Sequence, residues 1–367
     1  MSRWAWAEVS AGAIEHNVRH LADVVAPAQV WAVVKADGYG HGAEPAARAA
    51  LAGGAAGLCV ALVQEGVALR AVGIQAPILV LSEQPAASVA AAVANQLAIT
   101  VYSEAQLVAL AECGAAGHPV HLKVDTGMRR VGVATHEAVA LADAIVASPA
   151  ARLAGVFTHL AVADEPGNPF TDHQLDRFDE VLAQLAAAGH RPPLVHAANS
   201  AGALAHPRAR YGMVRAGVAI YGISPGAGVD HLCTALVPAM ALHARVSHVK
   251  RVAAGERISY GLRHTFDRDT TVATLPLGYA DGVPRRLHAV GATVLVGGHH
   301  RPIVGVVTMD QMMVDCGDDD VQPGDDAVLI GRQGEHTITA TDWAESLDTI
   351  AYEIVCGVSA RVERRPV

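Results

Sequence analysis

Lys35 is the first residue whose type and surroundings suggest chemistry. It ends the apolar run Val30–Lys35, and a glycine-rich stretch that contains Tyr39 follows it directly. Lys and Arg together number 27, yet only Lys35, Lys123 and Lys250 are lysines. Apolar surroundings lower the pKa of an ammonium group, as a lysine that forms a Schiff base requires. The alternative is an ordinary exposed lysine at a strand end, which the rarity of lysine and the glycine-rich context weaken.

The segments that must position Lys35 alternate in type up to about residue 222. Short β-branched runs predict strands, and Ala-rich amphipathic stretches predict helices between them, for example over Glu104–Glu112, His136–Ala147 and Asp172–Ala188. The expected strands are Val30–Lys35, Gly57–Ala61, Pro77–Leu81, Ala98–Tyr102, Val120–Asp125, Leu153–His159, Leu194–Ala197 and Val214–Tyr221. Such alternation predicts an α/β fold, a (β/α)8 barrel whose active site lies at the carboxyl ends of the strands.

The pattern changes from about Val237. Val, Thr, Gly and Asp alternate with turn signals such as Pro323-Gly324-Asp325, and long helical patterns become scarce. Pro225-Gly226-Ala227-Gly228 has the composition of a linker. We therefore expect the barrel over residues 1–228 and a mainly β C-terminal domain over residues 229–367.

Composition excludes several classes of protein. The net charge is −9 without a basic run, which argues against nucleic acid as a partner. The five cysteines form no CxxC pair, so neither a disulfide framework nor a zinc site is indicated. Apolar residues make up 51%, but no apolar run reaches the roughly 20 residues of a membrane span. Because the N-terminus lacks the apolar region of a signal peptide, we expect a cytoplasmic enzyme that contacts no membrane.

Eight sequence motifs follow one another over nearly the whole chain. They are KADGYGHG (35–42), HLKVDTGM (121–128), GVFTHLAVADE (155–165), HAANSAGAL (196–204), VRAGVAIYG (214–222), ISYG (258–261), LGYADG (277–282) and MDQ (309–311). Together and in this order, these blocks resemble the alanine racemase family. The resemblance implies an isomerase that depends on pyridoxal 5'-phosphate and interconverts L- and D-alanine. It also implies a homodimer that supplies D-alanine as a peptidoglycan precursor.

The resemblance assigns each part of the cofactor a partner. It implies that Lys35 carries the cofactor as a Schiff base and that Arg215 faces the pyridine nitrogen. Since arginine does not readily give up its proton, the ring nitrogen would stay unprotonated and the cofactor would be a weaker electron sink. A salt-bridged core residue is the alternative for Arg215. The phosphate would be bound by Tyr39, Ser200, Gly217 and Val218, of which the hydroxyls and turn amides suit an anion.

Tyr260 matches the second catalytic base of the family. Racemisation needs a proton removed on one face of the α-carbon and delivered on the other, and Lys35 and Tyr260 would serve opposite faces. Hydrogen bonds through His196 and Arg215 would lower the pKa of the phenol. The family arrangement brings Tyr260 from the neighbouring subunit, so each active site would be shared across a dimer.

Further positions match family residues around the cofactor, the substrate and its access path. Arg130 would contact the cofactor's phenolic oxygen and the substrate carboxylate, and Lys123 matches a lysine that is often carbamylated. Met309 would bind substrate. The remaining matches are His159 and Asn199 at the cofactor, and His196, Tyr279 and Asp310 in supporting roles; a metal is not expected.

Three positions depart from the family pattern. Arg129 adds a cation beside Arg130, and Thr308 stands where a cysteine is frequent. Ala360 replaces the tyrosine of the family's SYR motif near the C-terminus. That tyrosine helps to hold the phosphate and narrows the substrate site, so Ala360 suggests that serine is accepted better than in typical members.

Other functions remain open alternatives at this point. A non-enzymatic, pyridoxal-phosphate-binding barrel protein with a homeostatic role usually lacks the C-terminal β-domain that carries ISYG and MDQ. A racemase of broader specificity would keep the same machinery, whereas a barrel-type decarboxylase would not be expected to place an arginine such as Arg215 at the pyridine nitrogen. The 19 histidines include no HxH or HExxH spacing of a metal-dependent hydrolase.

Overall fold

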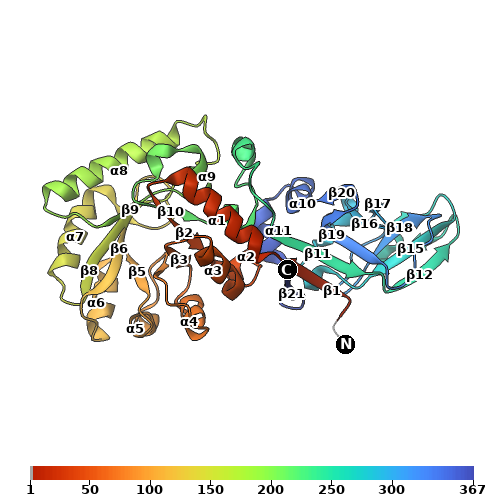
Figure 1. The fold of residues 1–367 in the computed structure, drawn as a ribbon, viewed down its shortest axis with the longest axis horizontal. Coiled ribbons are helices and arrows are strands. Elements are labelled where there is room, and N and C mark those ends of the chain that lie inside the picture. The colour runs from red at the N-terminus through yellow and green to blue at the C-terminus, as the bar shows by residue number, and fades with distance from the viewer. Residues whose placement is uncertain (1–2) are drawn as a thin grey trace. The chain divides into compact units, whose positions relative to one another are not determined.

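The computed structural model describes residues 3–367, which divide into two compact units (Figure 1). The barrel unit comprises Gly12–Gly38 and Ala43–Val237. The C-terminal unit comprises residues 3–11, Tyr39–Gly42 and Pro238–Val367. The domain boundary expected after residue 228 stays a prediction.

Eight parallel strands form the centre of the barrel unit. They are β2 (Gln29–Val33), β3 (Gly57–Val60), β4 (Ile78–Val80), β5 (Ala98–Val101), β6 (His118–Asp125), β8 (Ala151–Phe157), β9 (Leu194–His196) and β10 (Met213–Ala216). The hydrogen-bonded order is β10-β2-β3-β4-β5-β6-β8-β9, with β7 (Val133–Ala134) beside β6. Gly212 N donates to Val195 O at 3.1 Å and Arg215 N to Ala198 O at 3.0 Å, so the sheet nearly closes between β9 and β10. The predicted barrel is confirmed.

Helices follow the strands and lie around them (Figure 1). They are α1 (Ala11–Val25), α3 (Ala43–Ala52), α4 (Val63–Ala71), α5 (Ala86–Ala94), α6 (Glu104–Glu112), α7 (Ala138–Ala147), α8 (Phe170–Ala187) and α9 (Ser200–Ala205). Helix α1 buries Ile14, Val18, Leu21 and Val25, a spacing that places one apolar stripe against the strands. Strands β3 and β4 are buried at every position, as parallel strands covered by helices require.

Several expected strands end earlier than predicted, and two of these ends involve residues expected at the cofactor. The run Val214–Tyr221 does not form one strand, because β10 ends at Ala216 and residues Val218–Tyr221 form a 3-10 helix. Gly217 makes the break with φ −106° and ψ −103°, which is neither strand nor helix. The run Val30–Lys35 also ends early, since β2 stops at Val33 and Lys35 begins a tight turn.

The C-terminal unit is mainly β, as predicted. Its strands are β1 (Ala5–Val9), β11 (Met240–Arg245), β12 (His248–Val252), β13 (Arg257–Ile258), β14 (His264–Thr265), β15 (Thr270–Leu275), β16 (Thr293–Val296), β17 (His299–Pro302), β18 (Met312–Gly317), β19 (Asp326–Gln333), β20 (His336–Ile338) and β21 (Glu363–Pro366). One sheet has the order β17-β16-β19-β11-β1-β21, with β20 beside β19; a second has the order β12-β15-β18. Two helices, α10 (Ala340–Leu347) and α11 (Ala351–Gly357), complete the unit.

The N-terminal strand β1 belongs to this second unit. It pairs antiparallel with β11 and parallel with β21. Alternate residues of β1 are buried, as expected of a strand with one face toward a core.

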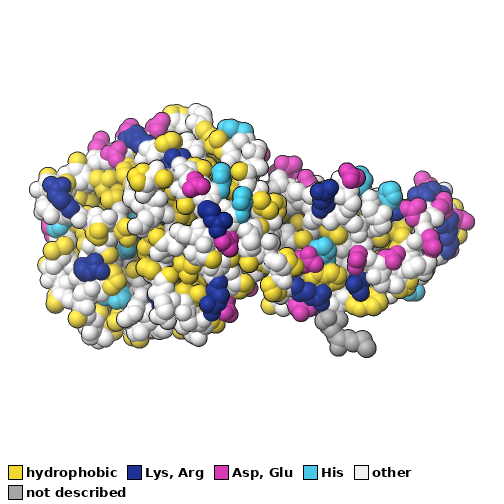
Figure 2. All heavy atoms as spheres, in the orientation of Figure 1, with side chains coloured by type: hydrophobic (Ala, Val, Ile, Leu, Met, Phe, Trp, Pro, Cys, Tyr) yellow, Lys and Arg dark blue, Asp and Glu magenta, His cyan; other side chains and the backbone are white. Residues whose placement is uncertain are grey.

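The surface carries charges of both signs. In the view of Figure 2, basic and acidic side chains are interspersed over the described residues, without an extended basic patch. Among the described helices, none is both long enough and apolar enough to cross a membrane.

Candidate active site

Lys35 lies at the carboxyl end of β2 and starts an unusual turn. Ala36, Asp37 and Gly38 have φ angles of 52°, 53° and 62°, in the left-handed region. That conformation costs a non-glycine residue roughly 1–2 kcal/mol, so it persists only where neighbouring groups enforce it. The backbone next to Lys35 is therefore held by other parts of the barrel unit.

Glu65, at the start of α4, is one of those groups. Its Oε1 accepts a hydrogen bond from Ala36 N at 2.6 Å, and its Oε2 accepts from Ala61 N at 2.8 Å and Leu62 N at 3.0 Å. One carboxylate thus ties the turn after β2 to the loop after β3. This arrangement fixes the point at which the Lys35 side chain leaves the backbone.

Arg215, on β10, is buried and is surrounded by hydrogen-bond acceptors. Its Nη1 donates to His196 Nδ1 at 2.7 Å, and its Nη2 donates to the carbonyls of Thr158 and Ala197, each at 2.9 Å. A third contact joins Nη2 to His159 Nδ1 at 3.2 Å. Within residues 3–367, the partners of the guanidinium are carbonyl groups and imidazoles, so the salt-bridged alternative for Arg215 is wrong.

Positive charge is concentrated at this end of the barrel unit. The pKa of Lys123 is lowered to about 7, first by burial and then by the positive charges of Arg215, Arg130 and Lys35. The negative charge of Asp125 acts in the opposite direction and raises this pKa. Lys123 Nζ donates to Leu81 O at 3.4 Å and lies 5.2 Å from the ring centroid of Phe157.

The histidines beside this cluster are held neutral. Burial and then Arg215 lower the pKa of both His159 and His196 well below the ordinary histidine range. The region is therefore suited to a ligand that carries negative charge.

Three of the four residues expected at the phosphate, Ser200, Gly217 and Val218, lie together in the barrel unit. Ser200 Oγ accepts hydrogen bonds from Gly217 N at 2.9 Å and Ala219 N at 3.3 Å. Val218 follows Gly217 directly and begins the 3-10 helix. Asn199 caps α9, because its Oδ1 accepts from Gly202 N at 2.9 Å.

Tyr39 falls in the C-terminal unit, with the short segment Tyr39–Gly42. Its ring lies 6.1 Å from that of Tyr352, between centroids. At Gly40 a Cβ atom would lie 2.1 Å from the carbonyl oxygen of Val355, so only glycine allows this close backbone approach. Two glycines of the KADGYGHG block therefore have structural reasons: Gly38 adopts a left-handed conformation, and Gly40 allows a close backbone contact.

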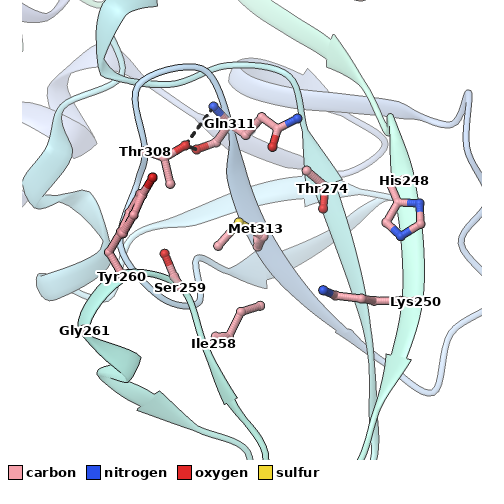
Figure 3. Close-up of a pocket in the computed structure, with 10 residues that line it drawn as sticks. All are labelled: His248, Lys250, Ile258, Ser259, Tyr260, Gly261, Thr274, Thr308, Gln311 and Met313. Carbon is pink, nitrogen blue, oxygen red and sulfur yellow. Dashed lines mark hydrogen bonds between the residues drawn. The ribbon is translucent and has the colours of Figure 1, made fainter.

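Tyr260 lies at a pocket of about 680 Å³ in the C-terminal unit (Figure 3). It begins a 3-10 turn over Tyr260–Leu262, and its side chain is exposed. Figure 3 shows the phenol reaching toward Thr308, whose hydroxyl donates to Gln311 O at 2.8 Å and accepts from Gln311 N at 3.2 Å. Lys250 extends into the same pocket from β12.

The turn that carries Met309 and Asp310 is fixed by backbone and ionic contacts. Tyr279 N donates to Thr308 O at 3.0 Å, and Ala280 N donates to Met309 O at 3.1 Å. Asp310 Oδ1 accepts a hydrogen bond from Arg361 Nη2 at 2.6 Å. The structure therefore holds the turn at Tyr279 against the turn that carries Met309 and Asp310.

Two residues of the barrel site were missed from the sequence. Glu65 gives no local signal, because its partner Ala36 is 29 residues away. His121 contacts His196 and does give a signal: His121 and Lys123 alternate with apolar residues over 120–124 of β6, which places both on one face. The expected link from His196 and Arg215 to Tyr260 stays a prediction.

Fold and site together define a barrel protein with a separate β-domain and a buried cationic centre at the carboxyl ends of the barrel strands. The comparisons with known proteins agree. Residues 9–225 match the family described as alanine racemase, N-terminal domain, and residues 239–366 match alanine racemase, C-terminal domain. The chain therefore belongs to the alanine racemase family and is an enzyme.

Similar proteins cover the chain from end to end. The alanine racemase of Symbiobacterium thermophilum is 50% identical over 366 residues, covering 99% of this chain and 97% of that protein. That of Thermobifida fusca is 46% identical over 370 residues, covering 99% and 98%. The crystal structure of the Bacillus anthracis alanine racemase with bound L-Ala-P has a TM-score of 0.95 at 39% identity, covering 100% of this chain and 96% of that chain.

Proposed function

We propose that this chain is a pyridoxal 5'-phosphate-dependent racemase that interconverts L- and D-alanine. The observation that carries the proposal is the cationic centre built around Lys35 and Arg215, in a chain whose full-length relatives are alanine racemases. Lys35 and Tyr260 are the two proposed catalytic residues.

The positively charged side chains of the barrel unit suit this negatively charged cofactor. Lys35, Lys123, Arg130 and Arg215 all lower the pKa of His159, so four cations act on one region. A phosphate and a phenolate oxygen would compensate that excess of positive charge. Arg130 is the proposed contact to the phenolic oxygen and to the substrate carboxylate, with His159 and Asn199 beside the cofactor.

Side chains of this protein would remove and return the α-proton of the substrate. The bound cofactor supplies an electron sink that makes the α-proton of the amino acid removable. Lys35 Nζ takes or returns that proton on one face, and the phenolic oxygen of Tyr260 does so on the other. Arg215 would donate a hydrogen bond to the ring nitrogen without transferring its proton, because a guanidinium does not readily give up a proton. Tyr39, Ser200, Gly217 and Val218 are the proposed phosphate ligands.

We propose that Tyr260 acts in the active site of a second copy of this chain. Tyr260 lines a pocket of its own unit and is nevertheless 73% exposed. Met309 is 52% exposed on the turn beside the same pocket and is the proposed substrate contact, with Tyr279 and Asp310 in support. A homodimer with shared sites would use these exposed groups.

Lys123 is proposed to carry a carbamate. Its lowered pKa of about 7 leaves much of the amine uncharged at neutral pH. The uncharged Nζ attacks the carbon of CO2, a nitrogen–carbon bond forms, and one proton leaves to solvent. The product is an anion beside Arg130 and Arg215, and it converts one cation of the cluster into a counter-charge.

A chiral assay tests the proposed function. Purified protein loaded with pyridoxal 5'-phosphate is incubated with L-alanine, and the two enantiomers are separated and measured over time. We expect an approach to equal amounts of both, with no conversion by the Lys35→Ala and Lys35→Arg variants, the second of which keeps the positive charge. Unchanged L-alanine with the unmutated protein contradicts the proposal. The biological role proposed is supply of D-alanine for peptidoglycan in the cytoplasm.

Ala360 supports a second candidate activity, the racemisation of serine. Ala360 is exposed, between Ser359 and Arg361, where family members carry a tyrosine. The smaller side chain leaves room for a hydroxymethyl group. We expect Ala360→Tyr to lower kcat/KM for serine relative to alanine; an unchanged ratio contradicts this hypothesis.

A further inference from the structure

Three polar side chains form a continuous hydrogen-bonded row inside the barrel unit. His121 on β6, His196 on β9 and Arg215 on β10 are all buried. His121 Nδ1 lies 2.9 Å from His196 Nε2, and His196 Nδ1 lies 2.7 Å from Arg215 Nη1. The row therefore joins Arg215 to a histidine that has no part in the function proposed above.

The barrel leaves room for this row and fixes the planes of its rings. His121 is paired in register with Gly155 on β8, where a Cβ atom would lie 2.4 Å from His121 Nδ1. Glycine at that position is thus what admits the imidazole. Phe157 stacks on His196 with centroids 4.6 Å apart and planes 8° apart, so the His196 ring has little freedom to tilt.

The donors and acceptors in the row determine where its protons lie. A guanidinium donates hydrogen bonds and accepts none, so His196 Nδ1 must accept from Arg215 and carries no proton. The proton of neutral His196 then lies on Nε2 and is donated to His121 Nδ1. His121 accepts through Nδ1 and carries its own proton on Nε2.

We propose that His121 is a positioning residue, which holds His196 in the Nε2–H form and through it fixes the guanidinium of Arg215. The inference rests on the proposed function in that Arg215 faces the cofactor ring. Without an acceptor at His121, the buried Nε2–H of His196 loses the side-chain acceptor that it has among the described residues. The other tautomer would then compete, and its Nδ1–H would point at the N–H groups of Arg215.

The charge states of the two histidines agree with this arrangement. Burial, followed by Arg215, lowers the pKa of His121 to about 3. The same causes lower the pKa of His196 well below the ordinary range. Both rings are therefore neutral at physiological pH, each with one N–H, and the N–H of His196 lies in the hydrogen bond between them.

Two variants of His121 separate hydrogen bonding from packing. In His121→Asn the side-chain oxygen takes nearly the place of Nδ1 and still accepts from His196. His121→Leu has a similar size to Asn and accepts nothing. The tautomer of His196 is measured by NMR on protein with ¹⁵N-labelled histidine and bound pyridoxal 5'-phosphate, and His196→Gln assigns the signals.

We expect the unmutated protein and His121→Asn to show His196 protonated at Nε2 and bare at Nδ1. We expect His121→Leu to lose that pattern and to lower kcat on the order of ten-fold, the size that loss of a ligand-orienting partner typically has, with little change in KM. A proton on Nδ1 of His196 in the unmutated protein overturns the proposal, even where the Leu variant does not fold. Equal spectra and rates for the Asn and Leu variants overturn it too.

The NMR result is independent of the reaction. A protein that leaves alanine unchanged but shows the Nε2–H tautomer contradicts the proposed function and keeps the hydrogen-bond assignment. A protein that racemises alanine but shows His196 protonated at Nδ1 supports the proposed function and contradicts the positioning role of His121.

Discussion

In the barrel unit, Lys123, His196 and Arg215 are each at most 5% exposed, whereas in the C-terminal unit Tyr260, Tyr279 and Met309 are at least 43% exposed. The barrel groups have their positions set by several hydrogen bonds and by packing, before any ligand binds. The C-terminal groups lie on short turns and present their side chains to solvent.

This contrast separates two ways of building a catalytic group. A buried, hydrogen-bonded cation is part of the core, so its removal affects both folding and chemistry. An exposed phenol has few packing contacts, so its removal affects chemistry alone. The comparison therefore predicts which substitutions reduce stability and which reduce only activity.

The largest effect is expected from Arg215→Leu. Removal of the guanidinium leaves His196 Nδ1 and the carbonyls of Thr158 and Ala197 without their donor, which should lower the free energy of unfolding by about 3 kcal/mol and abolish racemisation. Chemical denaturation and the chiral assay measure the two effects. Arg208→Leu, at a surface arginine paired with Asp176 and Asp179, is the matched control and should cost less than about 1 kcal/mol. Equal decreases in the free energy of unfolding for the two variants would contradict the proposed difference between buried and surface arginines.

Tyr260→Phe should affect activity alone. Loss of a general acid–base group costs roughly 10²- to 10⁴-fold in rate, whereas an exposed substitution changes stability by no more than about 0.5 kcal/mol. The chiral assay and thermal unfolding measure both quantities, with Tyr102→Phe in the barrel unit as the control. Near-normal racemisation by Tyr260→Phe would exclude this phenol as a base.

Lys123 should make stability depend on pH. Its folded-state pKa is lowered from 10.5 to about 7, so between these values the unfolded chain binds a proton that the folded chain does not. The free energy of unfolding should therefore rise as pH increases from about 7 to 10 in CO2-free buffer, with a slope of at most about 1.4 kcal/mol per pH unit. Lys123→Met should lack this component. Parallel curves for both proteins would show that the lysine keeps its ordinary pKa.

Glu65→Gln should have the smallest effect of the series. The amide keeps one acceptor oxygen for three backbone N–H groups and loses the charge, so the free energy of unfolding should fall by about 1–2 kcal/mol. Glu44→Gln, at an exposed helix position paired with Arg48, should change it by less than about 0.5 kcal/mol. A Glu65 effect no larger than that of Glu44 would mean that the Lys35 turn is held elsewhere.

Elements whose signal is local were predictable from the sequence. Glu104–Glu112 is helical over those residues, because the amphipathic run is continuous and Gly114 follows it closely. The strand at Ala98–Tyr102 ends one residue early, at Val101. Only three residues are lysines, and two of them, Lys35 and Lys123, lie in the cationic centre.

Features that depend on distant parts of the chain were not predictable. Strand β1 pairs with β11 and β21, more than 200 residues away, and the sequence of Ala5–Val9 does not indicate which strands it will pair with. The left-handed turn after Lys35 contains Ala36 and Asp37, whose local preferences oppose it, and its contact with Glu65 exists only in the fold. The strand expected over Val214–Tyr221 was too long, because β-branched and aromatic residues continue past Gly217 whereas the extended backbone ends at Ala216.

We propose that the buried centre of one barrel unit and the exposed phenol of another subunit make one active site. This proposal is tested most directly by co-expressing Lys35→Ala and Tyr260→Phe chains with different tags and purifying the mixture. Each variant alone should be inactive. A mixed dimer would contain one site with both residues intact, so random pairing should restore about a quarter of the unmutated activity. A mixture as inactive as its components, in preparations where both tags co-purify, would contradict the shared site.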